Sequence, residues 1–272
     1  MKLKKIEKKI SYFLKRLTEY PLVQLDDFVV DSNDKCKIPK IVYQTWENRF
    51  FGKTHFKELI KFRNLNKNYS FLLFDKLKRD SYMQEHWGEH EIYKVYQMSK
   101  FGQMKADIFR YCILFERGGY YFDISKGYSE SLDNLSNPNT EAIISYEPVE
   151  CIIPPNKKLL QIMKHPHKNI LQWGLGFSKN HLILEMVINA IVNDYQFYID
   201  KIFEIPKTGV LSLTATGQFT KIVREYIQEK GTENLIQAGV YFNQKGIFSM
   251  KGSRVRHHLI KEYADERNKS IL

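Results

Sequence analysis

One helix runs almost directly into one strand, and this junction constrains the fold more than any other feature of the 272-residue sequence. Residues 102–117 carry apolar side chains at helical spacing, and Gly118-Gly119 follows them as a strong C-terminal stop. Residues 120–125 then alternate as a strand does. A helix joined to a strand so closely is typical of α/β domains, in which helices pack on a largely parallel sheet.

Further strands and helices alternate on both sides of this junction. Strands are predicted at 38–46, 69–74, 142–146 and 174–178, with short ones at 235–241 and 247–250. Helices are predicted at 54–64, in two stretches over 76–99, at 181–198 and at 214–230. The pattern predicts one α/β domain over residues 36–260, preceded by a separate segment at 1–21 and followed by a C-terminal tail at 261–272.

Residues 2–19 have the pattern of a basic amphipathic helix. Apolar residues recur every three or four positions, and Lys and Arg fill most of the other face. Such a helix can lie on an anionic membrane surface. It can also pack on the domain and leave its charged face in water, so both interpretations stay open.

The net charge of +11 is concentrated at this N-terminus. Residues 1–20 contain seven Lys or Arg and two Glu, a net +5, which leaves +6 for the other 252 residues. A basic surface attracts the phosphates of nucleic acids, lipids or nucleotides. A body as mildly basic as this one argues against a broad nucleic-acid interface, and we therefore expect no nucleic-acid partner.

The three cysteines, Cys36, Cys112 and Cys151, form no Cys-x-x-Cys pair, which indicates a reducing compartment without a disulfide framework. The sequence contains no run of about 18 apolar residues that would predict a membrane span. The N-terminus lacks the apolar core of a secretory signal. These features predict a cytoplasmic protein, with a peripheral contact to the inner face of the membrane through residues 2–19 left open.

The candidate residues for chemistry lie at the helix–strand junction. Asp107 and Arg110 are three residues apart and share a helix face. Strand alternation places Tyr121, Asp123 and Ser125 on one side. Ligands of open α/β sheets bind beyond the carboxyl ends of the strands, which is where Asp123 falls. From this pattern alone, Asp123 is either a binding residue or an ordinary surface carboxylate beside an exposed helix pair.

The same junction resembles a known family. It looks like the core of the DXD sugar transferases, and within them it is closest to glycosyltransferase family 32, which includes capsular-polysaccharide transferases and mannosyltransferases. The matching residues are Asp107-x-x-Arg110-Tyr111 and Gly118-Gly119-x-Tyr121-x-Asp123-x-Ser125. Residues 38–46 and 68–75 resemble the first two strands of that family, so the clear likeness covers residues 38–128.

The resemblance implies a GT-A fold, a Rossmann-like and mostly parallel sheet flanked by helices that holds a nucleotide-sugar. It implies that Asp107, Arg110 and Asp123 are catalytic, with Asp107 and Arg110 gripping the sugar and the diphosphate. Gln44, Trp46 and Tyr121 would border the donor as well, although Trp46 could equally be a core side chain.

The implied reaction moves a hexose or hexosamine from a UDP- or GDP-sugar to a glycan or lipid-linked saccharide. The family transfers with retention, which gives an α-linked product. Bacterial surface polysaccharide synthesis, such as that of a capsule or a lipooligosaccharide, is the expected setting.

The resemblance also implies a divalent metal, Mn²⁺ or Mg²⁺, that bridges the donor diphosphate. Asp123 would be one ligand, but the second Asp of the motif is Ser125 here, a neutral and weaker ligand for a hard cation. His257 or His258, which resemble a late histidine of the family, could complete the site, and a structural role for them stays open. The alternative is a non-catalytic protein that binds nucleotide-sugars or glycans through a degenerate DXD motif.

A zinc-peptidase pattern, H-x-x-E-H, also occurs in the sequence, at residues 86–90. On a helix, His86 and His90 would share a face and could hold zinc. Gly88 weakens a helix at this point, and no clear third ligand follows. A pair of surface histidines at a break between two helices is the favoured interpretation.

Overall fold

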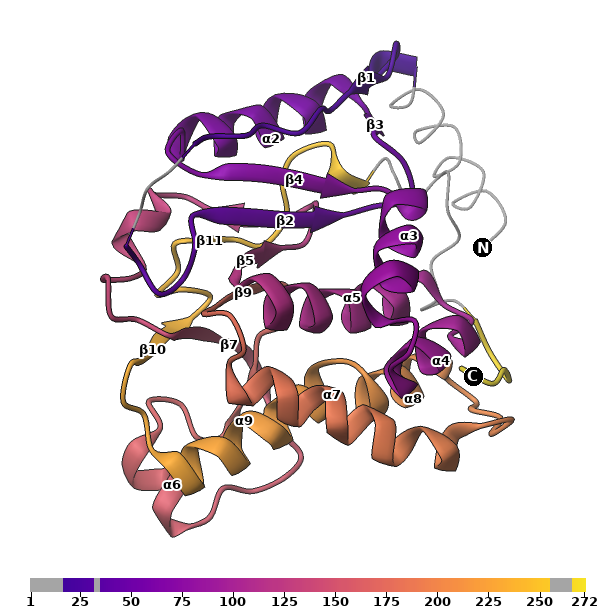
Figure 1. Cartoon of the computed structure of the whole chain (residues 1–272), viewed down its shortest axis with the longest axis vertical. Helices are drawn as coiled ribbons and strands as arrows, with labels where there is room; N and C mark the ends of the chain where they lie inside the picture. Colours follow the sequence, from indigo (N-terminus) through magenta and orange to yellow (C-terminus); the bar gives the residue numbers. More distant parts are fainter. Residues whose placement is uncertain (1–16, 32–34, 255–265) are drawn as a thin grey trace, which may run out of the picture.

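The computed structural model describes residues 17–31, 35–254 and 266–272, and a mixed β-sheet lies at its centre (Figure 1). Its strands are β2 (Ile41–Thr45), β4 (Ser70–Phe74), β5 (Gly119–Phe122), β7 (Ala142–Glu150), β8 (Lys168–Ile170), β9 (Gly174–Phe177) and β10 (Leu235–Val240). Two short antiparallel pairs lie outside it, β1 (Val23–Gln24) with β3 (Phe50–Phe51) and β6 (Gly127–Tyr128) with β11 (Gly246–Ile247).

The order of strands along the sheet is β10-β7-β9-β5-β2-β4, and β8 pairs with β7. β2 is parallel to both β4 and β5, and β10 is parallel to β7. β9 runs antiparallel between β5 and β7, so those two strands point the same way. The prediction of an α/β fold with a mostly parallel sheet is confirmed.

Helices cover both faces of the sheet (Figure 1). One face buries Tyr43 and Tyr121 with the larger set of helices, and the other buries Val42 and Phe122 with α2. The helices are α2 (Lys53–Leu65), α3 (Lys76–Trp87), α4 (Glu91–Met98), α5 (Gly102–Arg117), α6 (Lys157–Ile162), α7 (Leu182–Asp194), α8 (Pro206–Leu213) and α9 (Thr216–Lys230). Short 3-10 helices span Leu132–Asn134 and Tyr195–Tyr198.

The junction between α5 and β5 depends on its two glycines. Gly118 and Gly119 have φ angles of +67° and +107°, a region that residues with a Cβ rarely adopt. A Cβ on Gly119 would stand 2.7 Å from the carbonyl oxygen of Ile41. The glycines therefore let the helix stop and the next strand pair closely with β2.

The strand predicted at 120–125 is shorter than expected, because β5 ends at Phe122. The Asp123 N–H leaves the ladder and donates to the Trp173 carbonyl at 2.9 Å. The Lys126 N–H then donates to the Asp123 carbonyl at 2.8 Å and forms a turn. Asp123 consequently lies just past the strand, with its side chain at the edge of the sheet.

Both described ends of the chain pack beyond the predicted domain limits of 36–260. Leu25 is buried in the core, and so are Ile271 and Leu272, which were predicted to belong to a tail. Most of the predicted helix at 2–19, and both His257 and His258, lie outside the described residues. Among the helices that are described, none is long and apolar enough to span a bilayer.

Candidate functional site

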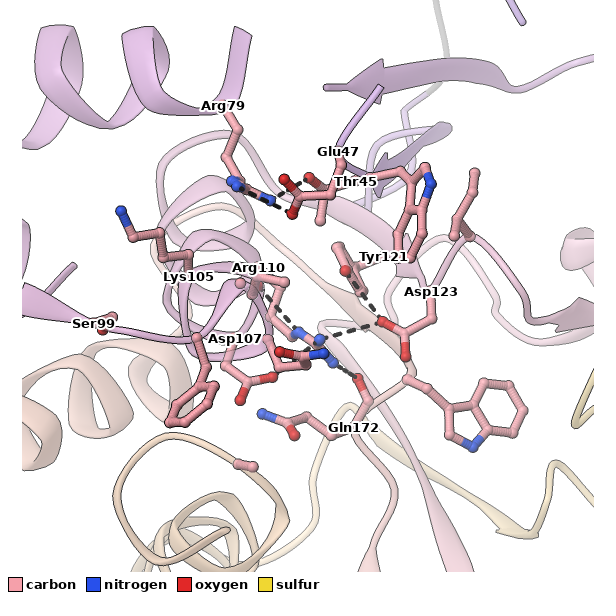
Figure 2. A pocket seen from close by; sticks show the side chains of 18 of the residues that line it. Thr45, Glu47, Arg79, Ser99, Lys105, Asp107, Arg110, Tyr121, Asp123 and Gln172 are labelled. Carbon is pink, nitrogen blue, oxygen red and sulfur yellow. Dashed lines mark hydrogen bonds and ion pairs between the residues drawn. The ribbon is translucent and has the colours of Figure 1, made fainter. Parts of the chain in front are cut away.

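A cavity of about 740 Å³ opens at the carboxyl edge of the sheet. Its walls come from the ends of β2 and β5, the first half of α5, the loop before β9 and the start of α9, and they include Thr45, Asp107, Asp123, Gln172 and Thr216. Figure 2 shows side chains that line it. Ligands of open α/β sheets bind at this edge.

Arg110 lies at the centre of the site (Figure 2). Its Nη2 is 3.0 Å from Asp107 Oδ1 and 3.2 Å from Asp123 Oδ1. Its Nη1 donates to the Gln172 carbonyl at 2.7 Å, and its Nε donates to the Ala106 carbonyl at 3.4 Å. Each nitrogen therefore has a protein acceptor, and the guanidinium is fixed between the two carboxylates.

Tyr121 forms the floor beneath this arrangement. Its ring centroid lies 4.5 Å from the guanidinium carbon of Arg110, a cation–π contact that desolvation strengthens. Its hydroxyl donates to Asp123 Oδ1 at 3.2 Å. Oδ1 is thus engaged twice, whereas no contact within the described chain engages Oδ2 of this partly exposed side chain. Within the described residues, Asp123 is therefore held through one oxygen, and its other oxygen is open to a ligand.

Asp107 is buried on α5, and Thr214 Oγ1 donates to its Oδ2 at 3.1 Å. Burial raises the pKa of Asp107 to about 7, the positive charge of Arg110 opposes this rise, and the charge of Asp123 adds to it. Burial alone would lower the pKa of Arg110, but Tyr121, Asp123 and Asp107 together raise it. Arg110 therefore stays charged, and Asp107 is the group of the site that titrates near neutrality.

Asp107, Arg110 and Asp123, which we call the triad, carry charges that do not cancel. When Asp107 and Asp123 are both ionised, two negative charges face the one positive charge of Arg110, which leaves a net −1. A net negative charge at this place in the cavity favours a cation or the hydroxyl groups of a sugar, and it disfavours a bare phosphate. The resemblance implied that Arg110 grips the diphosphate, yet protein acceptors already occupy all three of its nitrogens.

A second layer of polar residues orients the triad, and sequence reasoning missed it. Gln172 Nε2 donates to the Tyr111 hydroxyl and, at 3.1 Å, to the Thr214 carbonyl. The Tyr111 hydroxyl also donates to that carbonyl, at 3.0 Å. Because these partners lie more than 40 positions apart in the chain, no local pattern could have indicated the contacts.

Arg79 on α3 lies at the other end of the cavity, near Thr45 and Glu47 (Figure 2). Its Nη1 donates to Thr45 Oγ1 at 3.3 Å, and its Nη2 is 4.0 Å from Glu47 Oε1. Trp46, predicted to border the donor, lines the same cavity. Helical periodicity gave Arg79 no distinguishing signal, so this buried cation was not foreseen.

Gln44 does not join the other predicted residues. It is buried within β2, where alternation points it to the sheet face opposite Thr45. It is absent from the cavity wall, and its Nε2 has no hydrogen-bond partner in the described part of the protein. Thr45 takes the position at the cavity that was assigned to Gln44.

Ser125 lines the cavity together with Asp123, as the metal prediction requires. Within residues 17–31, 35–254 and 266–272, no group of three His, Cys, Asp or Glu side chains could hold a metal ion. Mg²⁺ in particular is often held by one or two carboxylates plus substrate phosphates and water. The free oxygen of Asp123 and the Ser125 hydroxyl fit such a partial site, and not an all-protein cage.

The histidines of the zinc-peptidase pattern have separate structural roles. His86 lies in the last turn of α3, and its Nδ1 is 2.9 Å from Glu116 Oε1. His90 is the N-cap of α4, where its Nδ1 accepts the Ile92 N–H at 3.1 Å. The break at Gly88 separates the two, which agrees with the favoured interpretation of surface histidines.

Residues 52–142 match the protein family described as "Glycosyltransferase sugar-binding region containing DXD motif". This range includes α5, β5 and the triad Asp107, Arg110 and Asp123, and it also includes Ser125. Thr45 and Trp46 lie just before it. The family match therefore falls on most of the side chains that the cavity brings together.

Curated relatives extend the similarity to three quarters of the chain. Two are named "Initiation-specific alpha-1,6-mannosyltransferase": the Candida albicans protein is 24% identical over 76% of this chain and 56% of its own length, and the Schizosaccharomyces pombe protein is 21% identical over 76% and 53%. "Inositol phosphoceramide mannosyltransferase 3" of S. pombe is 28% identical over 42% of this chain and 32% of its own length. The chain thus spans about half the length, or less, of the curated relatives it matches.

Two solved structures match the chain at low sequence identity and with TM-scores below 0.5. "PaToxG Glycosyltransferase" is 16% identical with a TM-score of 0.49, over 83% of this chain and 80% of its own. The catalytic domain of α-toxin from Clostridium novyi is 10% identical with a TM-score of 0.41, over 98% and 74%. The family match across the site and the mannosyltransferase relatives make this chain similar to the DXD-type glycosyltransferases of family 32 and support that assignment.

Proposed function

We propose that this protein transfers a hexose or hexosamine from a nucleotide-sugar to a glycan or lipid-linked saccharide. One observation carries the proposal: Arg110 holds Asp107 and Asp123 together in a cavity at the carboxyl edge of the sheet, inside the region that matches the sugar-binding family. Mannose is the favoured hexose, because several relatives are named mannosyltransferases.

In this proposal, the two carboxylates bind the donor and Arg110 positions them. The free Oδ2 of Asp123 accepts hydrogen bonds from sugar or ribose hydroxyls, and it is the first ligand for a cation. Asp107 is buried deeper, and Arg110 and Thr214 fix its orientation. Because each nitrogen of Arg110 already has a protein acceptor, other cations of the cavity, Lys76 and Lys105, are assigned to the diphosphate.

A divalent metal, Mg²⁺ or Mn²⁺, fits the net negative floor and would be held by Asp123, Ser125 and the donor phosphates. When bound, it would neutralise the leaving diphosphate. The residues of this chain orient the donor and keep the triad desolvated. Because Ser125 stands in place of a second carboxylate, the protein ligands bind the cation more weakly than two carboxylates would.

Retention of the anomeric configuration is part of the proposal. Two relatives are named for an α-1,6 linkage, and an α-linked product from an α-configured donor corresponds to retention. The leaving diphosphate itself can accept the proton of the acceptor hydroxyl in such a reaction, so no protein base is required. We further propose a cytoplasmic role in the synthesis of a bacterial surface polysaccharide.

A second candidate is a binding protein that holds nucleotide-sugars or glycans without turnover. Ser125 favours it, because the motif loses one carboxylate. The two candidates differ in whether diphosphate is released. A binder would hold a nucleotide yet release no diphosphate from any donor, with any acceptor and in either metal.

The test is release of nucleoside diphosphate from a panel of UDP- and GDP-hexoses, in Mn²⁺ and in Mg²⁺, with and without saccharide acceptors. The wild-type protein should hydrolyse or transfer at least one donor, and Asp123→Asn should reduce the rate about 100-fold or more, as is typical when a transition-state contact is lost. If no donor is turned over while a nucleotide still binds, the binding-protein alternative replaces the transferase.

A further inference from the structure

An exposed apolar segment lies outside the cavity, between β7 and α6. Within residues 149–160, Ile152 is 99% exposed, Val149 59%, Ile153 52% and Leu160 48%. Soluble proteins rarely expose several large apolar side chains so close together unless a partner covers them. Neither the cavity nor the proposed chemistry uses these side chains.

The exposure of this segment is built into the fold. Arg224, buried on α9, donates through Nη1 to the Ile153 carbonyl at 2.6 Å and through Nη2 to the Pro166 carbonyl. The Cys151 N–H donates to the His167 carbonyl at 2.8 Å. Asn156 caps α6, which packs against α9 (Figure 1). The isoleucines are therefore held outward by anchors on both sides.

The charge of the surrounding chain indicates what covers them. Residues 148–168 contain four lysines and one glutamate, Glu150, a net charge of +3. Lys164 Nζ and Lys168 Nζ donate to backbone carbonyls, at 2.7 Å and 2.9 Å, and among the described residues no carboxylate pairs with either lysine. Apolar side chains surrounded by lysines match the apolar core and anionic surface of a lipid bilayer.

A second exposed apolar segment provides the contrast. Residues 194–205 expose Phe197 (76%) and three isoleucines, but they contain Asp194, Asp200 and Glu204 against the single Lys201. A net charge of −2 is repelled by an anionic membrane. Exposure alone thus does not distinguish the two segments, whereas charge does.

We propose that residues 149–160 dock the protein on an anionic lipid bilayer, with Ile152 and Ile153 inserted among the acyl chains. Glu147, on the same strand β7, lines the cavity. Ile152 follows Glu147 by five residues, and five residues of extended chain span at most about 18 Å. Insertion of Ile152 would therefore place the membrane within about 18 Å of the cavity wall at Glu147. If the proposed function holds, this arrangement presents a lipid-linked acceptor to the site.

The experiment is flotation of the full chain with vesicles of phosphatidylcholine, alone or with phosphatidylglycerol. The wild type should bind the anionic vesicles, and raised salt should weaken that binding. Ile152→Asp/Ile153→Asp should lower the bound-to-free ratio about tenfold or more, and Ile152→Trp should raise it. Phe197→Asp is the matched control and should bind as the wild type does.

Nucleotide binding by each variant serves as the check on folding, and it also separates this proposal from the proposed function. Loss of vesicle binding with intact nucleotide binding supports docking, and failure of the protein to bind any nucleotide concerns the proposed function alone. The docking proposal is overturned if the aspartate variant floats as well as the wild type, or if the wild type ignores anionic vesicles. It is equally overturned if sedimentation velocity shows that the wild type is a dimer and that the same aspartate variant is a monomer.

Discussion

The guanidinium of Arg110 donates to the carboxylate of Asp123 at 3.2 Å, across the junction between α5 and β5. The two residues are 13 positions apart, and the glycine turn between them brings the helix face against the strand end. This contact fixes one oxygen of Asp123 and leaves the other toward the cavity. The local geometry of the chain therefore prepares a carboxylate for a ligand.

Removal of the Arg110 charge should damage both stability and activity. Arg110→Ala leaves the buried Asp107 and the partly exposed Asp123 without their cation, and removing one partner of a buried ion pair typically costs about 3–5 kcal/mol. Arg110→Lys keeps the charge but cannot bridge two carboxylates and a carbonyl as the planar guanidinium does. Chemical denaturation and diphosphate release should both show the order wild type, Lys, Ala.

Arg117→Ala on the same helix is the control for this series. Arg117 is partly exposed and pairs with Glu116, so its loss should cost less than about 1 kcal/mol. An Arg110→Ala protein as stable as the Arg117 variant would show that the triad is not energetically coupled.

Asp107→Asn should change how stability depends on pH. The folded-state pKa of Asp107 is raised from 3.8 to about 7, so the protonated form is favoured in the folded protein. The stability linked to protonated Asp107 is therefore fully present below pH 3.8. As pH rises from 3.8 toward 7, the free energy of unfolding falls by up to about 1.4 kcal/mol per pH unit. The Asn variant removes this loss, so its stability relative to the wild type should increase from pH 5 to pH 7.

The difference between the two proteins is the quantity to measure, because His181 acts in the opposite direction. Burial lowers the pKa of His181 to about 4, so the stability linked to its neutral form is lost as pH falls from 6.5. His181 is present in both proteins and cancels in the difference. A difference in unfolding free energy that stays flat from pH 5 to pH 7 would contradict the raised pKa of Asp107.

Gly119→Ala tests the close approach of β5 to β2. The φ of +107° and the clash at 2.7 Å with the Ile41 carbonyl oxygen act together, so we expect a loss of about 3 kcal/mol or more. Gly231→Ala is the matched control, since Gly231 has a φ of +83° but no atom within 4 Å. That variant should lose less, about 1–2 kcal/mol, because only the positive-φ backbone is strained. If urea titrations show that both variants lose the same unfolding free energy, the close approach of the Ile41 carbonyl does not explain the need for glycine at position 119.

Ser125→Asp should restore the second carboxylate of the motif. Ser125 lines the cavity beside Asp123, so a carboxylate at this position adds a charged ligand to the cation site. Nucleotide affinity in Mn²⁺ should rise about tenfold relative to the metal-free value, a change that corresponds to about 1.4 kcal/mol. Ser125→Ala serves as the control and should weaken the response to Mn²⁺. An unchanged response in the Asp variant, measured by calorimetry, would place the cation elsewhere.

The local features of the chain were predictable wherever one segment carried its own signal. The α5 boundaries at 102–117 and the strands near 41–45 and 70–74 follow from periodicity and from glycine stops. The missed helix α8 begins at Pro206 and contains Gly209, two residues that usually indicate a loop. Pro206 occupies the first turn, where a missing N–H costs nothing.

The site was predictable only in part, because half of it depends on contacts between distant segments. Asp107, Arg110, Tyr121 and Asp123 belong to one continuous helix–strand unit, and the structure brings them together. Gln172 and Thr214 enter from separate loops, with no local pattern to indicate them. The position of Gln44 depended on which face of β2 meets the cavity, and the motif alone does not decide that.

The most direct test of the donor site is a thermal-shift panel of UDP, GDP, CMP and their sugar conjugates, with and without Mn²⁺, on the wild type and on Asp123→Ala. A ligand at 100 times its dissociation constant adds about 2.7 kcal/mol, which for a chain of this size raises the melting temperature by roughly 5 °C. The account predicts that one nucleotide stabilises the wild type in this way and that Asp123→Ala loses the response. If no nucleotide shifts the wild type, or if the variant responds equally, Asp123 does not hold a nucleotide-sugar.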